Sequence, residues 1–142
     1  MMRASALPLF VVVSVLFLAS ACAGAKTLSQ ADLAHRRFVL ASVDGVAFAP
    51  APGAPDIEFG EGFRVYGRIC NRYSGPGTLE NGVLTVERMI STKMLCPDAA
   101  LNEFESLFAR MLRDGVQVEL SGKTLTLRGG GHVLVYTARD WV

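Results

Sequence analysis

The sequence reads Ile69-Cys70-Asn71-Arg72-Tyr73-Ser74-Gly75 around one cysteine and Ser91-Thr92-Lys93-Met94-Leu95-Cys96-Pro97 around the next, about 26 residues further along. A hairpin signal lies between these stretches, because Asn81-Gly82 is a pair that type I′ turns prefer. An export signal lies upstream, and exported cysteines meet an oxidising compartment. Cys70 and Cys96 are therefore candidates for a disulfide, which would stabilise the domain by about 3–4 kcal/mol in the chain-entropy model.

Residues 1–21 have the order of a bacterial secretory signal peptide. A positive start with Arg3 precedes an apolar run over residues 7–18, which is short for a membrane span. The stretch that follows resembles the lipobox of bacterial lipoproteins, whose cysteine becomes the acylated first residue: Leu18-Ala19-Ser20-Ala21-Cys22. We favour lipidation of Cys22, which would otherwise be an odd thiol in an oxidising space. Ordinary cleavage at Ala19-x-Ala21 or Ala23-x-Ala25 is the alternative and would give a soluble periplasmic protein.

A lipidated Cys22 would attach the protein to a membrane through several acyl chains, which stable anchoring requires. Ala23 follows the cysteine where an Asp would signal retention at the inner membrane, so the lipobox resemblance implies the outer membrane. We expect an outer-membrane lipoprotein of the bacterial cell envelope that faces the periplasm. Its parts would be a signal peptide (1–21), a lipid-anchored tether (22–34) and a folded domain (35–142).

The charge balance gives no sign of a nucleic-acid partner. The chain has 14 Lys+Arg and 13 Asp+Glu, and removal of residues 1–21 takes away one Arg, which leaves no formal net charge. The sequence has no basic run and no interleaving of basic and aromatic residues, so we expect no nucleic acid. Residues 22–142 suffice for one small domain with one core.

Most of the chain after His35 alternates apolar and polar residues with the period of β-strands. Strands are expected over residues 38–43, 56–59, 63–70, 78–86 (a hairpin), 116–120, 123–128 and 132–137. A helix is expected to open at Pro97 or Asp98 and to end at Gly115, with apolar residues on one face. The sequence therefore predicts an α+β fold: a curved antiparallel β-sheet, as a partly closed barrel, packed against one amphipathic α-helix.

The first cysteine stretch contains a conflict within this pattern. Strict alternation puts Cys70 on the same strand face as Arg64 and Arg68, which is the expected solvent face. A disulfide then needs either a bulge that turns Cys70 or a bridge outside the core. Gly75-Pro76-Gly77 is predicted to break the chain after this strand.

The sequence shows no recognisable catalytic or metal-binding constellation. There is no CxxC pair, and the only histidines, His35 and His132, lie far apart and are expected at the surface. A cysteine nucleophile would need a nearby base, and a G-x-S-x-G serine motif is absent. The run 129–131 of three glycines joins two strands, which favours a turn over a phosphate cradle. We expect no enzyme activity, no metal and no cofactor.

Two sets of residues are candidates for binding. The first is Asn71-Arg72-Tyr73-Ser74, since Arg and Tyr often anchor interfaces. We favour a simpler interpretation, in which Asn71 bonds local backbone at a strand end and Tyr73 packs into the core. The second set could line an apolar pocket, although a filled core is the simpler expectation: Met94, Phe104, Phe108 and Met111.

The two cysteine stretches and their surroundings resemble the META domain family of bacterial heat-shock lipoproteins. The resemblance covers about residues 36–138. It departs from the family at Ile69, where a Gly is usual, and at Phe38, where a Trp is common. The matching positions are Gly67-x-x-Cys70-Asn71-Arg72-Tyr73-Ser74-Gly75, Leu84-Thr85, Met89-x-x-Thr92-x-Met94-x-Cys96-Pro97, Thr124-Leu125-Thr126-Leu127 and Leu134-x-Tyr136.

The resemblance implies a small cell-envelope protein, associated with heat-shock induction and with tolerance to the antibiotic novobiocin. It also implies a sheet wrapped against a helix, and it gives no catalytic residues, because no enzymatic activity is established for the family. Cys70 and Cys96 match the motif cysteines, and five signature positions of unassigned role carry over: Asn71, Arg72, Tyr73, Thr92 and Met94. We expect a non-enzymatic domain that binds an unknown envelope protein partner. The alternative is a periplasmic carrier of a small hydrophobic ligand.

Overall fold

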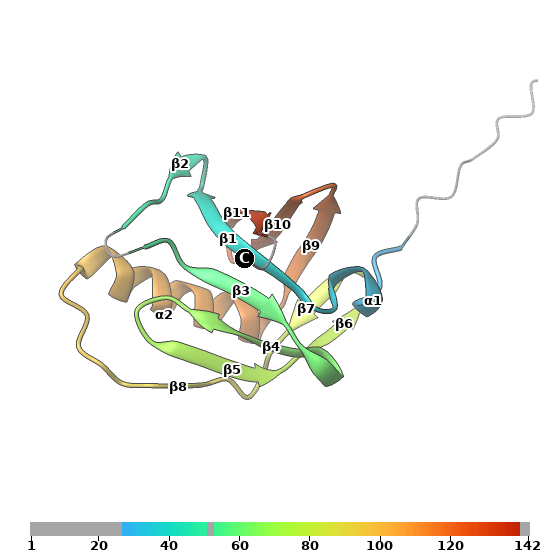
Figure 1. The fold of residues 1–142 in the computed structure, drawn as a ribbon, viewed down its shortest axis with the longest axis horizontal. Helices are drawn as coiled ribbons and strands as arrows, with labels where there is room; N and C mark the ends of the chain where they lie inside the picture. The colour runs from blue at the N-terminus through green and yellow to red at the C-terminus, as the bar shows by residue number, and fades with distance from the viewer. Residues whose placement is uncertain (1–26, 51–52, 140–142) are drawn as a thin grey trace, which may run out of the picture.

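The computed structural model describes residues 27–50 and 53–139, so the expected signal peptide and Cys22 lie outside the described residues. Figure 1 shows the arrangement of the elements. Their order is α1 (Gln30–Leu33), β1 (Arg36–Val43), β2 (Val46–Ala47), β3 (Asp56–Phe59), the 3-10 helix η1 (Glu61–Phe63), β4 (Arg64–Arg68), β5 (Arg72–Pro76), β6 (Thr78–Glu80), β7 (Val83–Thr85), β8 (Ile90–Ser91), α2 (Ala99–Asp114), β9 (Val116–Ser121), β10 (Thr124–Gly129) and β11 (His132–Arg139).

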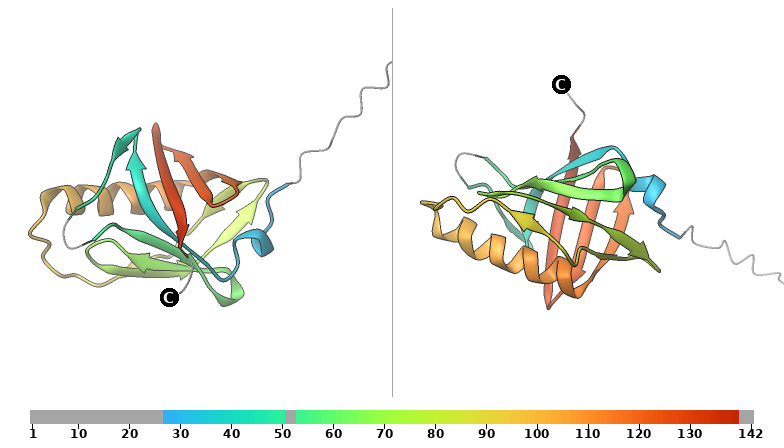
Figure 2. Two further views of the ribbon diagram at one scale, coloured as in Figure 1. Left: turned by 45° about the horizontal axis from the view of Figure 1, so that its top comes forward. Right: turned by 90° about the horizontal axis from the view of Figure 1, so that it is seen from below.

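The described strands form one antiparallel sheet in the order β6-β7-β9-β10-β11-β1-β3-β4-β5-β8, with β2 paired to β1. Strands β3 to β5 run in a different direction from β9 to β11, so the sheet curls into a half-barrel (Figures 1 and 2). The register of β1 on β11 shifts between Leu40 and Ser42, a bulge of the kind that bends a sheet. The predicted α+β class, a curved antiparallel sheet with one main helix, is confirmed.

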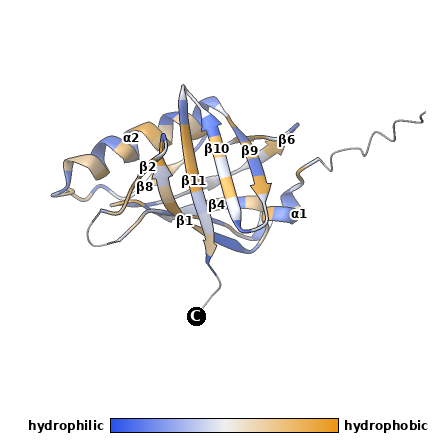
Figure 3. Ribbon diagram, turned by 90° about the horizontal axis from the view of Figure 1, so that it is seen from above, coloured by the Kyte–Doolittle hydropathy of each residue, from blue (hydrophilic) through white to orange (hydrophobic). Residues whose placement is uncertain are grey.

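Helix α2 has both of its predicted ends. The side chain of Asp98 accepts a hydrogen bond from the backbone N–H of Ala100 at 2.8 Å, and the N–H of Gly115 donates to the carbonyl of Met111 at 2.9 Å. Hydrophobic and hydrophilic residues recur in turn along the helix in Figure 3. The buried face consists of Leu101, Phe104, Phe108, Met111 and Leu112. These side chains belong to the same core cluster as the apolar residues of the strands.

The strand boundaries predicted around Cys70 were wrong. Strand β4 ends at Arg68, and a second strand, β5, begins at Arg72 and runs through the segment that was expected to break the sheet. Gly75 suits this strand because a Cβ there would lie 2.6 Å from Cγ1 of Val86. The glycine therefore permits close packing rather than a turn. Cys70 lies in the connection between two paired strands, where strand alternation no longer sets its direction.

The segment expected to be a tether also contains structure. Residues 30–33 form α1, which starts at a capping box between Ser29 and Asp32, and the side chain of Leu33 is completely buried in the core. The folded part of the chain therefore begins before residue 35. Among the described residues, no helix has both the length and the apolar character needed to cross a membrane.

Candidate functional site

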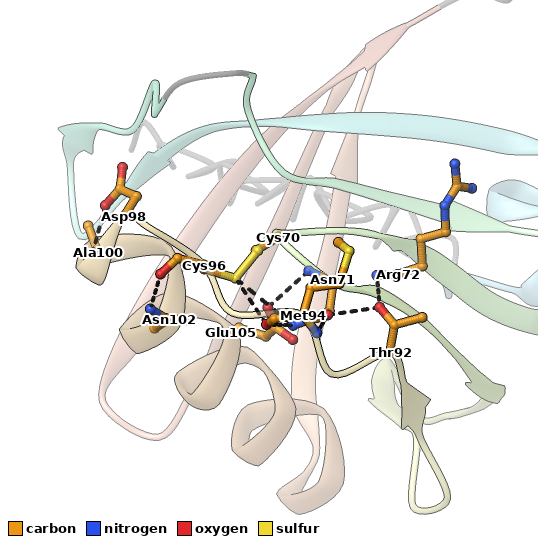
Figure 4. Close-up of a disulfide and its surroundings, with 10 residues drawn as sticks. All are labelled: Cys70, Asn71, Arg72, Thr92, Met94, Cys96, Asp98, Ala100, Asn102 and Glu105. Atoms are coloured by element: carbon orange, nitrogen blue, oxygen red, sulfur yellow. Dashed lines mark hydrogen bonds between the residues drawn. A yellow bond between two sulfur atoms is a disulfide. The ribbon is translucent and has the colours of Figure 1, made fainter.

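Cys70 and Cys96 form a disulfide, with their Cα atoms 6.1 Å apart. We call the residues around it, 69–74 and 91–97, the disulfide corner (Figure 4). Cys96 is buried and Cys70 is half-buried against the core. The bridge joins the connection after β4 to the extended segment before α2, beside the short pairing of β5 with β8. It therefore fixes the position of the exposed residues on either side of it.

Asn71 is the second connection within the disulfide corner. Its Oδ1 accepts hydrogen bonds from the backbone N–H of Met94 at 2.7 Å and from Oγ1 of Thr92 at 2.8 Å. Its Nδ2 donates to the carbonyl of Met94 at 3.3 Å, and its backbone N–H donates to the carboxylate of Glu105 on α2 at 3.2 Å. The backbone carbonyl of Asn71 accepts a local hydrogen bond from the N–H of Ile69 at 3.0 Å. The side chain does not bond local backbone as predicted, because its partners lie more than 20 residues away in the sequence. Asn71, a signature residue of the family, therefore has a structural role: it connects the β4–β5 connection to the segment before α2.

Hydrogen bonds between Thr92 and Arg72 extend this network toward the sheet. Oγ1 of Thr92 accepts a hydrogen bond from the backbone N–H of Arg72 at 3.1 Å, while the N–H of Thr92 donates to the carbonyl of Arg72 at 3.0 Å. The side chain of Arg72 extends away from this network (Figure 4). Arg72 is therefore the signature residue whose backbone is structural and whose charged group is exposed.

Tyr73 packs into the core, as the favoured interpretation of the sequence predicted. It is 4% exposed, and its ring centroid lies 5.1 Å from that of Phe108 on α2. Its hydroxyl donates to the backbone carbonyl of Asp56 at 2.7 Å, and burial raises the pKa of Tyr73 well above its ordinary value. Gly67 makes room for this bond, since a Cβ there would lie 2.7 Å from the hydroxyl.

Exposed apolar side chains gather beside the disulfide. Leu95 is 94% exposed and Met94 is 58% exposed, although both belong to a segment that the disulfide and Asn71 hold in place. They lie beside a shallow cleft of about 320 Å³. We call its apolar lining the apolar rim: Ile69, Cys70, Met94, Leu95, Pro97 and Leu101.

A larger, polar cleft of about 740 Å³ lies on the outer face of strands β3, β4, β5 and β8. Three exposed arginines line it, Arg64, Arg68 and Arg72, and we call this surface the arginine face. Arg37 also lines the cleft, where it donates to Oδ2 of Asp56 at 2.5 Å and lies 3.5 Å from Glu58.

Asp56 is a structural residue that sequence reasoning did not identify. It is 8% exposed, its Oδ2 accepts from Arg37, and its Oδ1 accepts from the backbone N–H of Arg68 at 2.7 Å. The bond to Asp56 raises the pKa of the Arg37 guanidinium. The only signal in the sequence is an acidic residue at a strand start, which is too common to single out Asp56.

The four residues suggested for an apolar pocket do not meet around a common space. Phe104, Phe108 and Met111 are buried in the core, with the two rings stacked at 5.9 Å between centroids, whereas Met94 points to the surface. Met94 instead lines the cleft of the apolar rim.

The histidines are not near the cysteines. Nδ1 of His132 lies 2.8 Å from Oδ2 of Asp44, where the end of β1 meets the start of β11, and His35 is an exposed residue before β1. Within residues 27–50 and 53–139, no group of three His, Cys, Asp or Glu side chains is placed to hold a metal ion.

The curled sheet, the single long helix and the disulfide corner define a small α+β domain. The sequence profile of the META domain family matches residues 31–141, and the chain belongs to this family. It is 37% identical over 131 residues to the heat shock protein HslJ of Escherichia coli (strain K12), a match that covers 92% of this chain and 94% of that protein.

Two solved structures are similar to the described fold. A protein structure determined by NMR matches with a TM-score of 0.71 and 39% sequence identity, over 78% of this chain and 94% of that one. A second NMR structure, of a protein from Burkholderia xenovorans, matches with a TM-score of 0.65 over 79% of this chain and 87% of that one. At 20% identity the second match supports the fold alone.

Proposed function

We propose that this protein is a non-enzymatic domain of the bacterial cell envelope that contributes to heat-shock and envelope stress tolerance by binding a protein partner. Membership of the META domain family and the similarity to a protein named a heat shock protein support the stress role. Tolerance to novobiocin, which the family resemblance implies, is part of the proposal. The binding surface is the apolar rim of the disulfide corner.

The observation that carries this proposal is the exposure of Met94 and Leu95 on a rigid support. Single exposed apolar residues are common, but two in succession beside an apolar cleft form a patch. The disulfide and the bonds from Asn71 to Met94 hold this segment before any partner arrives. A preordered surface loses little conformational entropy on binding, which favours affinity.

The test compares stress survival between two variants that remove exposed apolar surface. In cells that lack the native gene, Met94→Ser/Leu95→Ser is expected to lower survival after heat shock and growth in novobiocin. Val46→Ser, which changes a 70% exposed apolar residue on strand β2, is the control and should behave as wild type. Full tolerance in the Met94/Leu95 variant, at equal protein levels, would contradict binding at the apolar rim.

We propose further that Cys22 is acylated and holds the domain at the outer membrane, facing the periplasm. The lipobox-like stretch before Cys22 supports this placement. Intact mass of membrane-extracted protein should show acyl chains on a chain that begins at Cys22, and Cys22→Ser should move the protein from the membrane to the soluble fraction. An unacylated wild-type mass that begins at Cys22 or Lys26 would indicate a soluble periplasmic protein instead.

The cleft at the apolar rim also supports the alternative of a carrier for a small hydrophobic ligand. Its volume of about 320 Å³ and its lining by Ile69, Met94 and Leu101 would suit part of an acyl chain. Native mass spectrometry of protein purified from the envelope separates the two proposals. A bound lipid that Met94→Ser/Leu95→Ser no longer retains would favour the carrier, whereas ligand-free protein would favour the protein partner.

A further inference from the structure

The arginine face has a regular geometry that the proposed protein-binding role does not use. Across strands β4 and β5, Arg68 is paired directly with Arg72. Two residues earlier on β4, Tyr66 is paired with Ser74, so both pairs lie on the same face of the sheet. Ser74 in turn stands opposite Ile90 of β8, which is 68% exposed. Two arginines, a phenol, a hydroxyl and an apolar side chain therefore line one cleft of about 740 Å³.

The acidic residues of this cleft already have cationic partners. Asp56 accepts two hydrogen bonds from Arg37 and a third from the backbone N–H of Arg68, and Glu58 lies 3.5 Å from Arg37. Burial, the charge of Glu58 and a hydrogen bond to Glu58 raise the pKa of Tyr66, so its phenol stays protonated. Four arginines and two carboxylates therefore line the cleft, which leaves an excess of positive charge, and one arginine, Arg37, contacts both carboxylates.

The guanidinium groups of Arg68 and Arg72 have no anionic partner in the described part of the chain. Arg64 differs, because its Nη2 donates to Oγ of Ser74 at 2.8 Å. Like charges directly opposite each other on neighbouring strands destabilise a sheet, and an anion bound between them would remove this repulsion. Arginine presents a fork of N–H donors that matches the oxygens of a phosphate or carboxylate.

We propose that the arginine face is a binding site for an organic phosphate, with the phosphate group held by Arg68 and Arg72. A phosphate dianion matches two guanidinium charges, whereas a single carboxylate matches one. The cleft is far larger than a phosphate group, so the organic part of the ligand lies along Tyr66 and Ile90. The inference goes beyond the proposed function, since it concerns another face and another class of ligand.

The test is an NMR titration of the folded domain with inorganic phosphate and with glycerol 3-phosphate. Saturable shifts are expected at the amides of residues 66–74. Arg68→Gln/Arg72→Gln should lower the affinity about 10- to 100-fold, because it removes charge-assisted hydrogen bonds. Arg110→Gln/Arg113→Gln, which removes the same charge from the exposed side of α2, should leave the affinity unchanged. Arg68 lines both this cleft and the cleft of the apolar rim, whereas Arg72 lines only this one. The single variant Arg72→Gln therefore tests the arginine face without changing the apolar rim.

Two further measurements make the outcome decisive. Without phosphate, Arg68→Gln/Arg72→Gln should be at least as stable as wild type, since it relieves like-charge repulsion, and it should lose the stabilisation that phosphate gives wild type. Absence of saturable shifts, equal loss in the Arg110/Arg113 control, or equal binding of the dicarboxylate succinate would overturn the proposal.

The phosphate could belong to a membrane lipid headgroup or to a soluble ester, and vesicles separate these sources. Sedimentation with vesicles of phosphatidic acid, whose headgroup is a phosphate monoester, but not with phosphatidylcholine vesicles, and competition by glycerol 3-phosphate would indicate a headgroup. Binding of glycerol 3-phosphate more tightly than inorganic phosphate, without sedimentation, would indicate a soluble ester. Vesicle binding that the two double variants lose equally would show general surface charge and overturn the site.

Discussion

The meander β9–β10–β11 and the disulfide corner are both antiparallel structure, but different interactions hold them. Each strand of the meander pairs with the next one in the sequence through a short turn, as Thr124 pairs with Ser121 and Gly129 with His132. In the disulfide corner, β5 pairs only briefly with β8, and side chains make the other connections between residues 20 to 26 positions apart: Asn71, Thr92 and the two cysteines.

This difference separates local from long-range stabilisation. Local pairing closes small loops at little entropic expense, so turn residues and alternation suffice to form the meander. The disulfide corner brings distant segments together, and it needs strong individual ties to offset the entropy of closing the loop. Mutations in the corner should therefore have larger and more specific effects than mutations in the turns of the meander.

Removal of the disulfide should have the largest effect. Cys70→Ala/Cys96→Ala opens a loop of 26 residues, and we expect a loss of about 3–4 kcal/mol in the free energy of unfolding. Guanidinium denaturation measures the loss, and a reducing agent should destabilise wild type but not the double variant. Hydrogen exchange should rise first in β4, β5 and β8 and last in the meander. A loss below about 1 kcal/mol would show that local contacts hold the corner as well.

Asn71→Ala should be the next most damaging change. The side chain is 7% exposed, and its loss leaves the backbone N–H of Met94 without a partner, which we expect to lower stability by about 2–3 kcal/mol. Asn102→Ala is a matched control, because Asn102 is exposed and makes one bond, to the carbonyl of Cys96 at 2.9 Å, worth about 1 kcal/mol. Equal losses for the two variants in urea denaturation would contradict a special role for Asn71.

Two glycines compare the meander with strand β4, which leads into the disulfide corner. A Cβ at Gly67 would lie 2.7 Å from the hydroxyl of Tyr73, and closer still to the backbone of Asp56, so Gly67→Ala should cost about 2–3 kcal/mol by overpacking. Gly122, in the β9–β10 turn, has a φ of +59° with open space around it, so Gly122→Ala should cost about 1 kcal/mol from backbone strain alone.

Asparagine should distinguish these two causes in thermal unfolding. Asn tolerates positive φ, so Gly122→Asn should recover part of the stability that Gly122→Ala loses. Gly67→Asn should be worse than Gly67→Ala, because a longer side chain deepens the clash. Recovery at both positions would mean that backbone conformation, and not packing, limits the residues allowed at Gly67.

The smallest effect should be a pH dependence at the start of β11. The bond to His132, followed by the bond from the backbone N–H of Val133, lowers the pKa of Asp44 from its ordinary value of 3.8. A lowered pKa in the folded state means that ionised Asp44 stabilises the fold above pH 3.8 and that this contribution is lost as the pH falls through the lowered pKa. The advantage of wild type over Asp44→Asn in chemical denaturation should therefore shrink below pH 3.8. An advantage that stays constant with pH would exclude this linkage.

The sequence predicted the elements whose signals are local. Asn81-Gly82 marked the β6–β7 turn, and both residues have the positive φ of that turn. Asp98 and Gly115 marked the ends of α2. The sequence prediction failed at Gly75, which was expected in a turn but allows close packing against Val86. It also failed at Leu33, which was expected in a tether but lies in a short helix that packs on the core. Both failures involve contacts with distant parts of the chain, which a local pattern does not contain.

The candidate surfaces were less predictable than the fold. Alternation placed Arg64 and Arg68 on the solvent face, but the missed strand β5 meant that Arg72 was not expected opposite Arg68. Met94 was grouped with the apolar residues of α2, yet the bonds between its backbone and Asn71 leave its side chain 58% exposed. Asp56 had no distinguishing pattern, since its partners come from three strands.

Hydrophobic period and turn chemistry act within a few residues, so the sequence predicted most of the strands, both ends of α2 and the β6–β7 turn. Long-range neighbours, in contrast, set which side chains became buried and which stayed exposed. Asn71 and Asp56 are buried with their hydrogen bonds satisfied, whereas Arg72 and Leu95 face solvent. The physical reason is that burial and hydrogen-bond partners depend on which strands become neighbours, and the half-barrel sets those neighbours only once the whole sheet has formed.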